Sequence, residues 1–308
     1  MDIFKQIALA QVPRILGFAD RKGDSKSYGC FDRYYWHYKL HDFSNVRFQE
    51  ASMLLALLYK HNFPGNIYYN RKNVLQWLKA SVNFWLKIEN RNGSFNEYYP
   101  HEYSYCATSF STYANTEAML LAGIKQDNRK LLKTGKWLAG NQNPQVSNQV
   151  AASAIALLNL HQVTREAWLK DTAHQKISSV IQAQHATGYY PEYGGFDIGY
   201  QTITLSCLGH YYLKTADKEV YKSLKKGVNF LKGRIGSDGS YDNSSTSRKT
   251  QYLHPFGLAV MKSDIIRKMI HGLEDNRILN PAWMDDRYCI HLTNDYLQAY
   301  LCDKNVYG

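Results

Sequence analysis

The chain has 308 residues, of which 44% are hydrophobic and 20% charged, so a sizeable core is possible and wholesale disorder is excluded. Lysine and arginine number 37 against 26 acidic residues, and the net charge of +11 favours an anionic partner. Tyrosine is unusually frequent, with 25 residues. Because a buried phenol needs a hydrogen-bond partner, this excess predicts a hydrated, aromatic surface or cleft.

Residues 2–17 place apolar side chains along one helical face. Lys5, Gln11, Pro13 and Arg14 interrupt the segment, which also lacks a small-residue cleavage site, so we do not expect a secretory signal. We expect a helix packed on the core, with peripheral association of this helix with a membrane surface as the alternative. No apolar run approaches the ~20 residues that span a bilayer.

The cysteines are odd in number, widely spaced and without a CxxC motif, which argues against a disulfide framework and a zinc site. They are Cys30, Cys106, Cys207, Cys289 and Cys302. A reducing cytoplasm is the expected compartment, and neither a metal nor an organic cofactor is expected. No DNA- or RNA-binding motif is recognisable, so nucleic acid is not an expected partner. The sequence predicts no particular oligomeric state.

Four segments share one pattern: an amphipathic helix, a polar turn with glycine or asparagine, and a helix rich in small residues. The turn glycines recur about every 50 residues, a period typical of repeat architectures. They are Gly93, Gly140, Gly188 and Gly239. Glycine supplies backbone angles that other residues resist. The first and last units lack this glycine turn.

The charged, amphipathic segments predict outer helices, and the segments poor in charge predict buried inner helices. The predicted outer helices are 2–17, 71–90, 126–139, 164–184, 216–234 and 263–274. The predicted inner helices are 47–60, 112–124, 148–161, 200–214, 251–262 and 288–302. Six such pairs predict an all-α, single-domain (α/α)6 toroid over residues 1–308. An open solenoid with capping units is the alternative.

The turns Asn92-Gly93-Ser94-Phe95 and Asp238-Gly239-Ser240-Tyr241 resemble those of toroidal families. These families include terpene cyclases and prenyltransferases, polysaccharide lyases and the C-terminal domain of glucuronyl C5-epimerases. Only Asp285-Asp286 approaches the Asp-rich motif of the cyclases, and no Asp/Cys/His zinc set stands out. The resemblance therefore implies a carbohydrate-active toroid of the lyase or epimerase kind rather than isoprenoid chemistry.

The loops that lead into the predicted inner helices contain 14 of the 25 tyrosines. In such a ring these loops converge on the axis, where a concave site is expected. Aromatic rings stack on sugars, and arginine holds a carboxylate in a bidentate fork. We therefore expect an acidic, uronate-containing polysaccharide or oligosaccharide as the substrate. The candidate substrate-binding residues are Trp36, His37, Arg47, Tyr99, Tyr190, Asp197, Tyr200, Arg248 and Arg287.

Two reactions compete within this class. A lyase or C5-epimerase needs an acid, a base and a group that neutralises the uronate carboxylate. The candidate acid–base residues are Tyr252 with His254, and His101 with Tyr103. A glycoside hydrolase instead needs two carboxylates roughly 5–10 Å apart. For this role the loops offer Glu97, Glu102, Glu192, Asp197 and Asp242.

Structural roles are the alternative for each of these residues. Arg47 and Glu50 have the spacing of an ion pair, and Glu97 and Glu192 are placed to cap inner helices. A toroid that binds a glycan or a protein without catalysis is the alternative for the chain as a whole.

Overall fold

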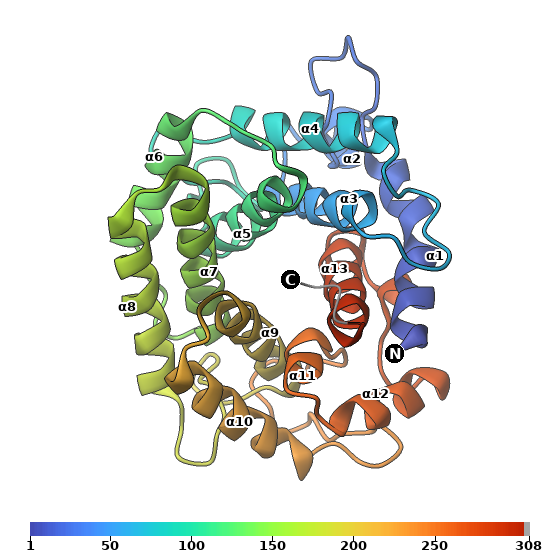
Figure 1. Cartoon of the computed structure of the whole chain (residues 1–308), viewed down its shortest axis with the longest axis vertical. Helices are drawn as coiled ribbons and strands as arrows, with labels where there is room; N and C mark the ends of the chain where they lie inside the picture. The colour runs from blue at the N-terminus through green and yellow to red at the C-terminus, as the bar shows by residue number, and fades with distance from the viewer. Residues whose placement is uncertain (305–308) are drawn as a thin grey trace.

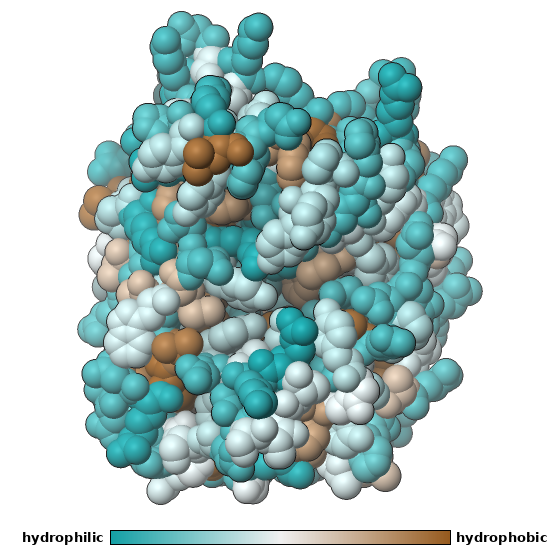
Figure 2. Space-filling view, turned by 180° about the vertical axis from the view of Figure 1, so that it is seen from behind, coloured by the Kyte–Doolittle hydropathy of each residue, from teal (hydrophilic) through white to brown (hydrophobic). Residues whose placement is uncertain are grey.

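The computed structural model describes residues 1–304, and all regular structure in this range is helical apart from isolated β-bridges. The prediction of an all-α chain is therefore confirmed. Seen from behind, the surface is mostly hydrophilic with small, separate hydrophobic spots (Figure 2). No helix within residues 1–304 is both long and apolar enough to span a bilayer.

An inner set of helices surrounds the centre of the molecule (Figure 1). Each inner helix contacts the next along the chain, and α13 contacts α3, so the contacts form a closed cycle. Side chains on nearly every face of the long inner helices are buried, which explains their small and apolar composition. The inner helices are α3 (Ala51–Lys60), α5 (Tyr105–Ala122), α7 (Ser147–Thr164), α9 (Ile198–Thr215), α11 (Phe256–Val260) and α13 (Asp286–Asp303).

An outer set of helices covers the inner set. Helix α1 packs on α13, α4 on α3, α6 and α8 on α7, α10 on α9, and α12 on α11. These helices bury one face, as α10 shows with Val220, Leu224 and Leu231, and the lysines of α10 face outward. The outer helices are α1 (Asp2–Phe18), α4 (Lys72–Lys87), α6 (Asn128–Gly140), α8 (Ala167–Ala183), α10 (Lys218–Lys232) and α12 (Ile265–Glu274).

The predicted helix bounds fail at two inner helices. Helix α5 begins at Tyr105 rather than at 112, because Ser104 caps it by accepting a hydrogen bond from the Ala107 N–H. Helix α11 has five residues, far fewer than the predicted 251–262. Pro255 disfavours helical angles at the residue before it, and so keeps the segment leading to α11 out of the helix. Three short elements complete the chain: α2 (Arg33–Trp36), η1 (Val46–Glu50) and η2 (Pro281–Trp283).

Glycine turns join neighbouring helix pairs. Gly93 has φ +93°, and a Cβ there would lie 2.5 Å from the Lys133 carbonyl oxygen of α6. Gly188 and Gly239 likewise have positive φ and approach the backbones of α10 and α12. Gly29 does the same against α4, so the first unit has a glycine turn after all. Gly140 is instead the last residue of α6, with open space around it, and is not a turn glycine of this kind.

A side chain of η1 or of an inner helix holds the turns at Gly29, Gly93 and Gly188. The Gln49 Oε1 accepts from the Phe31 N–H at 2.8 Å, and its Nε2 donates to the Gly29 carbonyl at 3.0 Å. Gln201 makes the equivalent bonds to the backbone of the Gly188 turn. In the Gly93 turn, the Thr108 hydroxyl accepts from the Phe95 N–H at 2.9 Å. Turn, inner helix and the next outer helix are thereby held as one unit.

We expect Gly93→Ala to lower the free energy of unfolding by about 3 kcal/mol, because alanine resists a positive φ and its Cβ collides with a backbone carbonyl. Gly140→Ala is the matched control, since its Cβ enters open space at a helix end. The control should be neutral or slightly stabilising. Urea denaturation of both variants measures the difference. Equal effects from the two substitutions would contradict the role given to the Gly93 turn.

Candidate functional site

A cleft of about 440 Å³ lies where the N-terminal ends of α5, α7, α9 and α13 come together. Helix N-termini carry partial positive charge, which favours an anion in the cleft. The first turns of these helices and the loops before them supply most of the lining. The lining residues used below are Arg47, Glu97, Glu102, Tyr103, Tyr200, Arg248, Tyr288 and His291.

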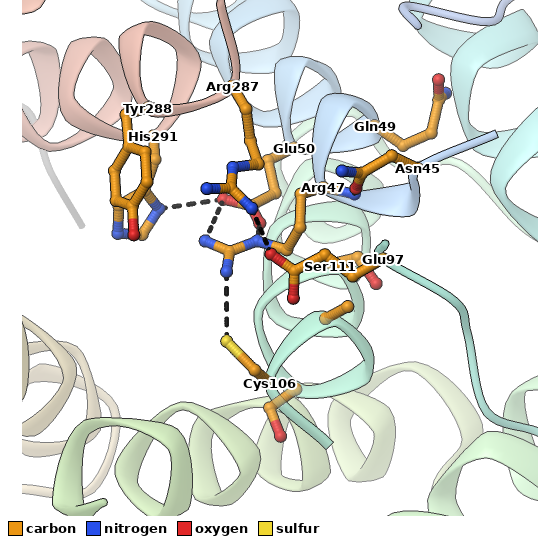
Figure 3. Close-up of polar contacts among 12 residues, drawn as sticks. Asn45, Arg47, Gln49, Glu50, Glu97, Cys106, Ser111, Arg287, Tyr288 and His291 are labelled. Atoms are coloured by element: carbon orange, nitrogen blue, oxygen red, sulfur yellow. Dashed lines mark hydrogen bonds and ion pairs between the residues drawn. The ribbon is translucent and has the colours of Figure 1, made fainter. Parts of the chain in front are cut away.

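Arg47 lines the cleft and is held there by several partners (Figure 3). Its guanidinium forms an ion pair with Glu50, donates to the Cys106 Sγ at 3.2 Å and lies over the Phe110 ring. Burial alone would favour a neutral Glu50, but the Arg47 charge and a hydrogen bond from His291 lower the pKa of Glu50 to about 2. The charge of Arg47 is thus already balanced by a carboxylate.

Arg287 is also paired. It donates to the Glu97 carboxylate and to the Tyr98 hydroxyl, as Figure 3 shows for Glu97. Its guanidinium lies 4.9 Å from the Tyr98 ring centre and 4.7 Å from that of Tyr288. The Ser104 hydroxyl makes a second, longer hydrogen bond to Glu97, at 3.4 Å. This pair joins the loop before α5 to the first turn of α13 at the cleft.

Arg248 differs from the other two arginines. Its guanidinium lies over the rings of Tyr193 and Tyr200, at 4.6 and 5.7 Å from their centres. Within residues 1–304 no carboxylate forms an ion pair with it. Arg248 therefore presents an unbalanced positive charge at the cleft wall, oriented by two aromatic faces.

Three tyrosines gather beside Arg248. The ring centres of Tyr252 and Tyr288 are 5.8 Å apart, and the side chain of Tyr200 is hydrogen-bonded to both. Burial and the neighbouring phenols raise the pKa of Tyr200 and of Tyr252 above that of a free tyrosine. Both hydroxyls keep their protons at neutral pH and can donate them. Tyr200 and Tyr288 line the cleft, whereas Tyr252 lies behind them.

Two histidines, His291 and His254, lie in the same region. The His291 Nδ1 donates to the Glu50 carboxylate at 2.9 Å, and His254 Nδ1 lies 3.2 Å from the Asp295 carboxylate. The two rings are 4.9 Å apart. Burial lowers the pKa of His291, so its ring is neutral at pH 7 and able to accept a proton. His291 lines the cleft, whereas His254 is almost wholly buried.

Tyr288 and His291 were not among the predicted site residues. The signal was present, because residues three apart share one helix face, and both follow the Asp285 cap that starts α13. Predicted site residues that line the cleft are Arg47, Glu97, Glu102, Tyr103, Tyr200 and Arg248. Three further predicted residues contact cleft residues without lining the cleft. Arg287 pairs with Glu97, Tyr252 contacts the Tyr288 ring, and His254 contacts the His291 ring.

Three predicted residues lie away from the cleft, buried in the scaffold. The Tyr190 hydroxyl bonds the Ser223 hydroxyl of α10 at 2.8 Å, in the core. Glu192 is fully buried and accepts from the Asn148 backbone and side chain at the start of α7. Asp197 caps α9 and accepts from Thr250. These side chains build the loops that surround the cleft, and do not line it.

The remaining predicted residues lie at the periphery. Trp36 donates from its indole to the Phe18 carbonyl at 2.7 Å, and His37 packs against the Trp36 ring. Tyr99 is 69% exposed, and His101 contacts only the edge of Tyr103. None of these four lines the cleft.

The two predicted carboxylates that line the cleft, Glu97 and Glu102, both come from the loop before α5. Glu102 accepts from the backbone N–H groups of Glu97 and Tyr98, within its own loop. Asp242 accepts from the Ser244 N–H at another turn. In the part of the chain that the structure describes, no three His, Cys, Asp or Glu side chains gather in a way that could hold a metal ion.

Burial raises the pKa of Glu192 to about 8, so the folded protein keeps this proton over a range where the unfolded chain has lost it. The folded state then binds more protons, and stability falls as pH rises from about 4.5 to 8, by on the order of 5 kcal/mol. We expect Glu192→Gln to remove this slope. The exposed Glu274→Gln control should keep it. Denaturant midpoints across this pH range test the prediction, and parallel curves for wild type and Glu192→Gln would refute it.

Comparison of the sequence with models of known protein families and with curated proteins finds no match.

Proposed function

We propose that the chain folds as a closed (α/α)6 toroid and that its cleft binds and transforms an acidic, uronate-containing glycan. The closed cycle of inner-helix contacts, each covered by outer helices, supports the toroid over the open solenoid. The observation that carries the ligand class is Arg248, a guanidinium at the cleft wall without a carboxylate partner within residues 1–304. A uronate carboxylate would supply the partner.

The reaction that these residues support is β-elimination or C5-epimerisation. Arg248 neutralises the substrate carboxylate, which makes the adjacent C5 proton easier to remove. His291 is neutral, and Glu50 holds its Nδ1–H, so the other ring nitrogen is the acceptor for that proton. Tyr200 keeps its hydroxyl proton and lies beside Arg248, where it can donate to the leaving oxygen. In epimerisation, the same donor returns a proton to C5 from the opposite face.

The hydrolase alternative has less support. It requires carboxylates on both sides of a scissile bond, and Glu97 and Glu102 come from one loop. Glu97 is paired with Arg287, and Glu102 holds backbone N–H groups. Binding without catalysis remains an outcome of the first experiment below.

Incubation with a panel of uronate-containing glycans should produce the ultraviolet absorbance of an unsaturated uronate, or deuterium uptake from solvent without cleavage. Arg248→Gln should raise KM about ten- to hundredfold, because it removes a charged hydrogen-bond donor to the carboxylate. Arg21→Gln is the matched control, since Arg21 also lies over an aromatic ring, that of Trp77, but outside the cleft. New reducing ends without unsaturation would favour the hydrolase. Tight binding without any change in the glycan would overturn the enzymatic proposal.

Tyr200→Phe should lower kcat by about a hundredfold or more while KM changes little, because only the proton donor is lost. Tyr221→Phe, an exposed tyrosine of α10, should leave both constants unchanged. Steady-state kinetics on the glycan identified in the panel measure the effect. A Tyr200→Phe variant with wild-type kcat would exclude Tyr200 as the donor.

A further inference from the structure

Beneath the cleft lies a small inner cavity of about 20 Å³, which is large enough for a single water molecule. His291 lines both this cavity and the cleft above it. His254, Asp295 and Glu50 line the cavity but not the cleft. The cavity therefore connects the proposed base to a second histidine and a second carboxylate that the substrate does not reach.

Two polar atoms at the cavity have no hydrogen-bond partner among the described residues. They are His254 Nε2 and Asn294 Oδ1, and both side chains are at least nine-tenths buried. An unpaired buried polar atom is costly, and a cavity of this size and polarity is the usual place for an ordered water. A water in contact with these two atoms would satisfy both.

The hydrogen bonds fix which nitrogen of each histidine is protonated. Glu50 and Asp295 are carboxylates held ionised by their partners, so the Nδ1 atoms of His291 and His254 carry the hydrogens that face them. The two Nε2 atoms are left to accept protons. With ring centres 4.9 Å apart, the two imidazoles are close enough that one charge opposes the other.

We propose that His254 and His291 share one proton through the buried water, and that His254 and Asp295 are positioning residues that set the protonation of His291. With the cleft empty, a proton on His291 Nε2 passes to the water, while the water gives one of its protons to His254 Nε2. Asp295 balances the imidazolium that forms on His254. His291 returns to the neutral state and can accept again. The catalytic part of this proposal rests on the proposed function, whereas the proton sharing itself does not.

Other groups around the pair contribute to its charge balance. Arg47 opposes protonation of His291 and Glu50 favours it. Asp295 favours the charged form of the nearby His210, which also lines the cavity. The titratable and charged groups that face the pair are Glu50 and Arg47 of η1, Cys106 and Tyr113 of α5, Cys207 and His210 of α9, and Asp295 of α13.

The direct test is an NMR titration of the histidine ring nitrogens in the full chain. In the wild type, the His291 signal should show two inflections, both shared with His254, because coupled groups titrate as a pair. In His254→Gln, which keeps a donor for Asp295, His291 should titrate in a single step at higher pH. Asp303→Asn, an exposed carboxylate of the same helix α13, should leave the wild-type curve unchanged. A single His291 step at the same pH in wild type and His254→Gln would overturn the proposal.

Circular dichroism establishes whether His254→Gln is folded, and if it is not, the wild-type curve decides alone. Shared inflections then support the pair, and two independent single steps overturn it. On the glycan, Asp295→Asn should lower kcat about tenfold and shift the pH profile while KM stays constant. A lower kcat with an unchanged pH profile would reduce Asp295 to a structural role. If the wild type transforms no glycan, the proposed function fails, but the NMR result on the histidine pair still stands.

Discussion

The contact between a glycine turn and the backbone of the next outer helix is the constraint on which the rest of the structure depends. At Gly29, Gly93, Gly188 and Gly239 the turn lies so close to a helix backbone that a Cβ would overlap it. Side chains such as Gln49 of η1 and Gln201 of α9 hydrogen-bond to the turn from the other side. These backbone contacts fix the position of each helix pair relative to the next. Side-chain packing alone would allow a wider range of positions.

This constraint places the cleft. The inner helices α5, α7, α9 and α13 all begin at the cleft. Their first turns then deliver Tyr200, Tyr288 and Cys106 to one space, and the loops before them deliver Arg248 and Glu97. The junction between α6 and α7, near Gly140, is made without such a glycine turn. There the buried Lys176 of α8 donates to the Asn141 carbonyl at 2.8 Å, and burial lowers the pKa of this lysine to about 8.

Much of the helical pattern could be predicted because the two kinds of helix have different compositions. Inner segments such as α7 are small and apolar all round, and outer segments such as α10 carry lysines on one face. Gly29 escaped prediction because its neighbours Tyr28 and Cys30 lack the polar pattern of the other turns. The predicted extent of α11 was wrong because Pro255 keeps the residues before it out of the helix, although the segment is apolar.

The candidate site was harder to predict for a physical reason. The loops contain similar residues whether a side chain lines the cleft, as Glu97 does, or supports a turn, as Glu192 does. In an irregular loop the direction of a side chain depends on partners distant in sequence, such as Asn148 for Glu192 and Arg287 for Glu97. Helical periodicity carries no information about such distant partners. For Tyr288 and His291, which lie on a regular helix, periodicity does predict that the two side chains share one face.

The packing of α1 against α13 has a kinetic consequence. Arg14 of α1 bonds the Asp286 carboxylate at 2.7 Å across 272 positions of sequence, and α13 also contacts α3. Contacts between such distant segments form slowly, because a long loop must close before they contribute any stabilisation. Arg287, Tyr288 and His291 all lie on α13. The cleft is therefore complete only once the N-terminal and C-terminal helices of the chain have packed together.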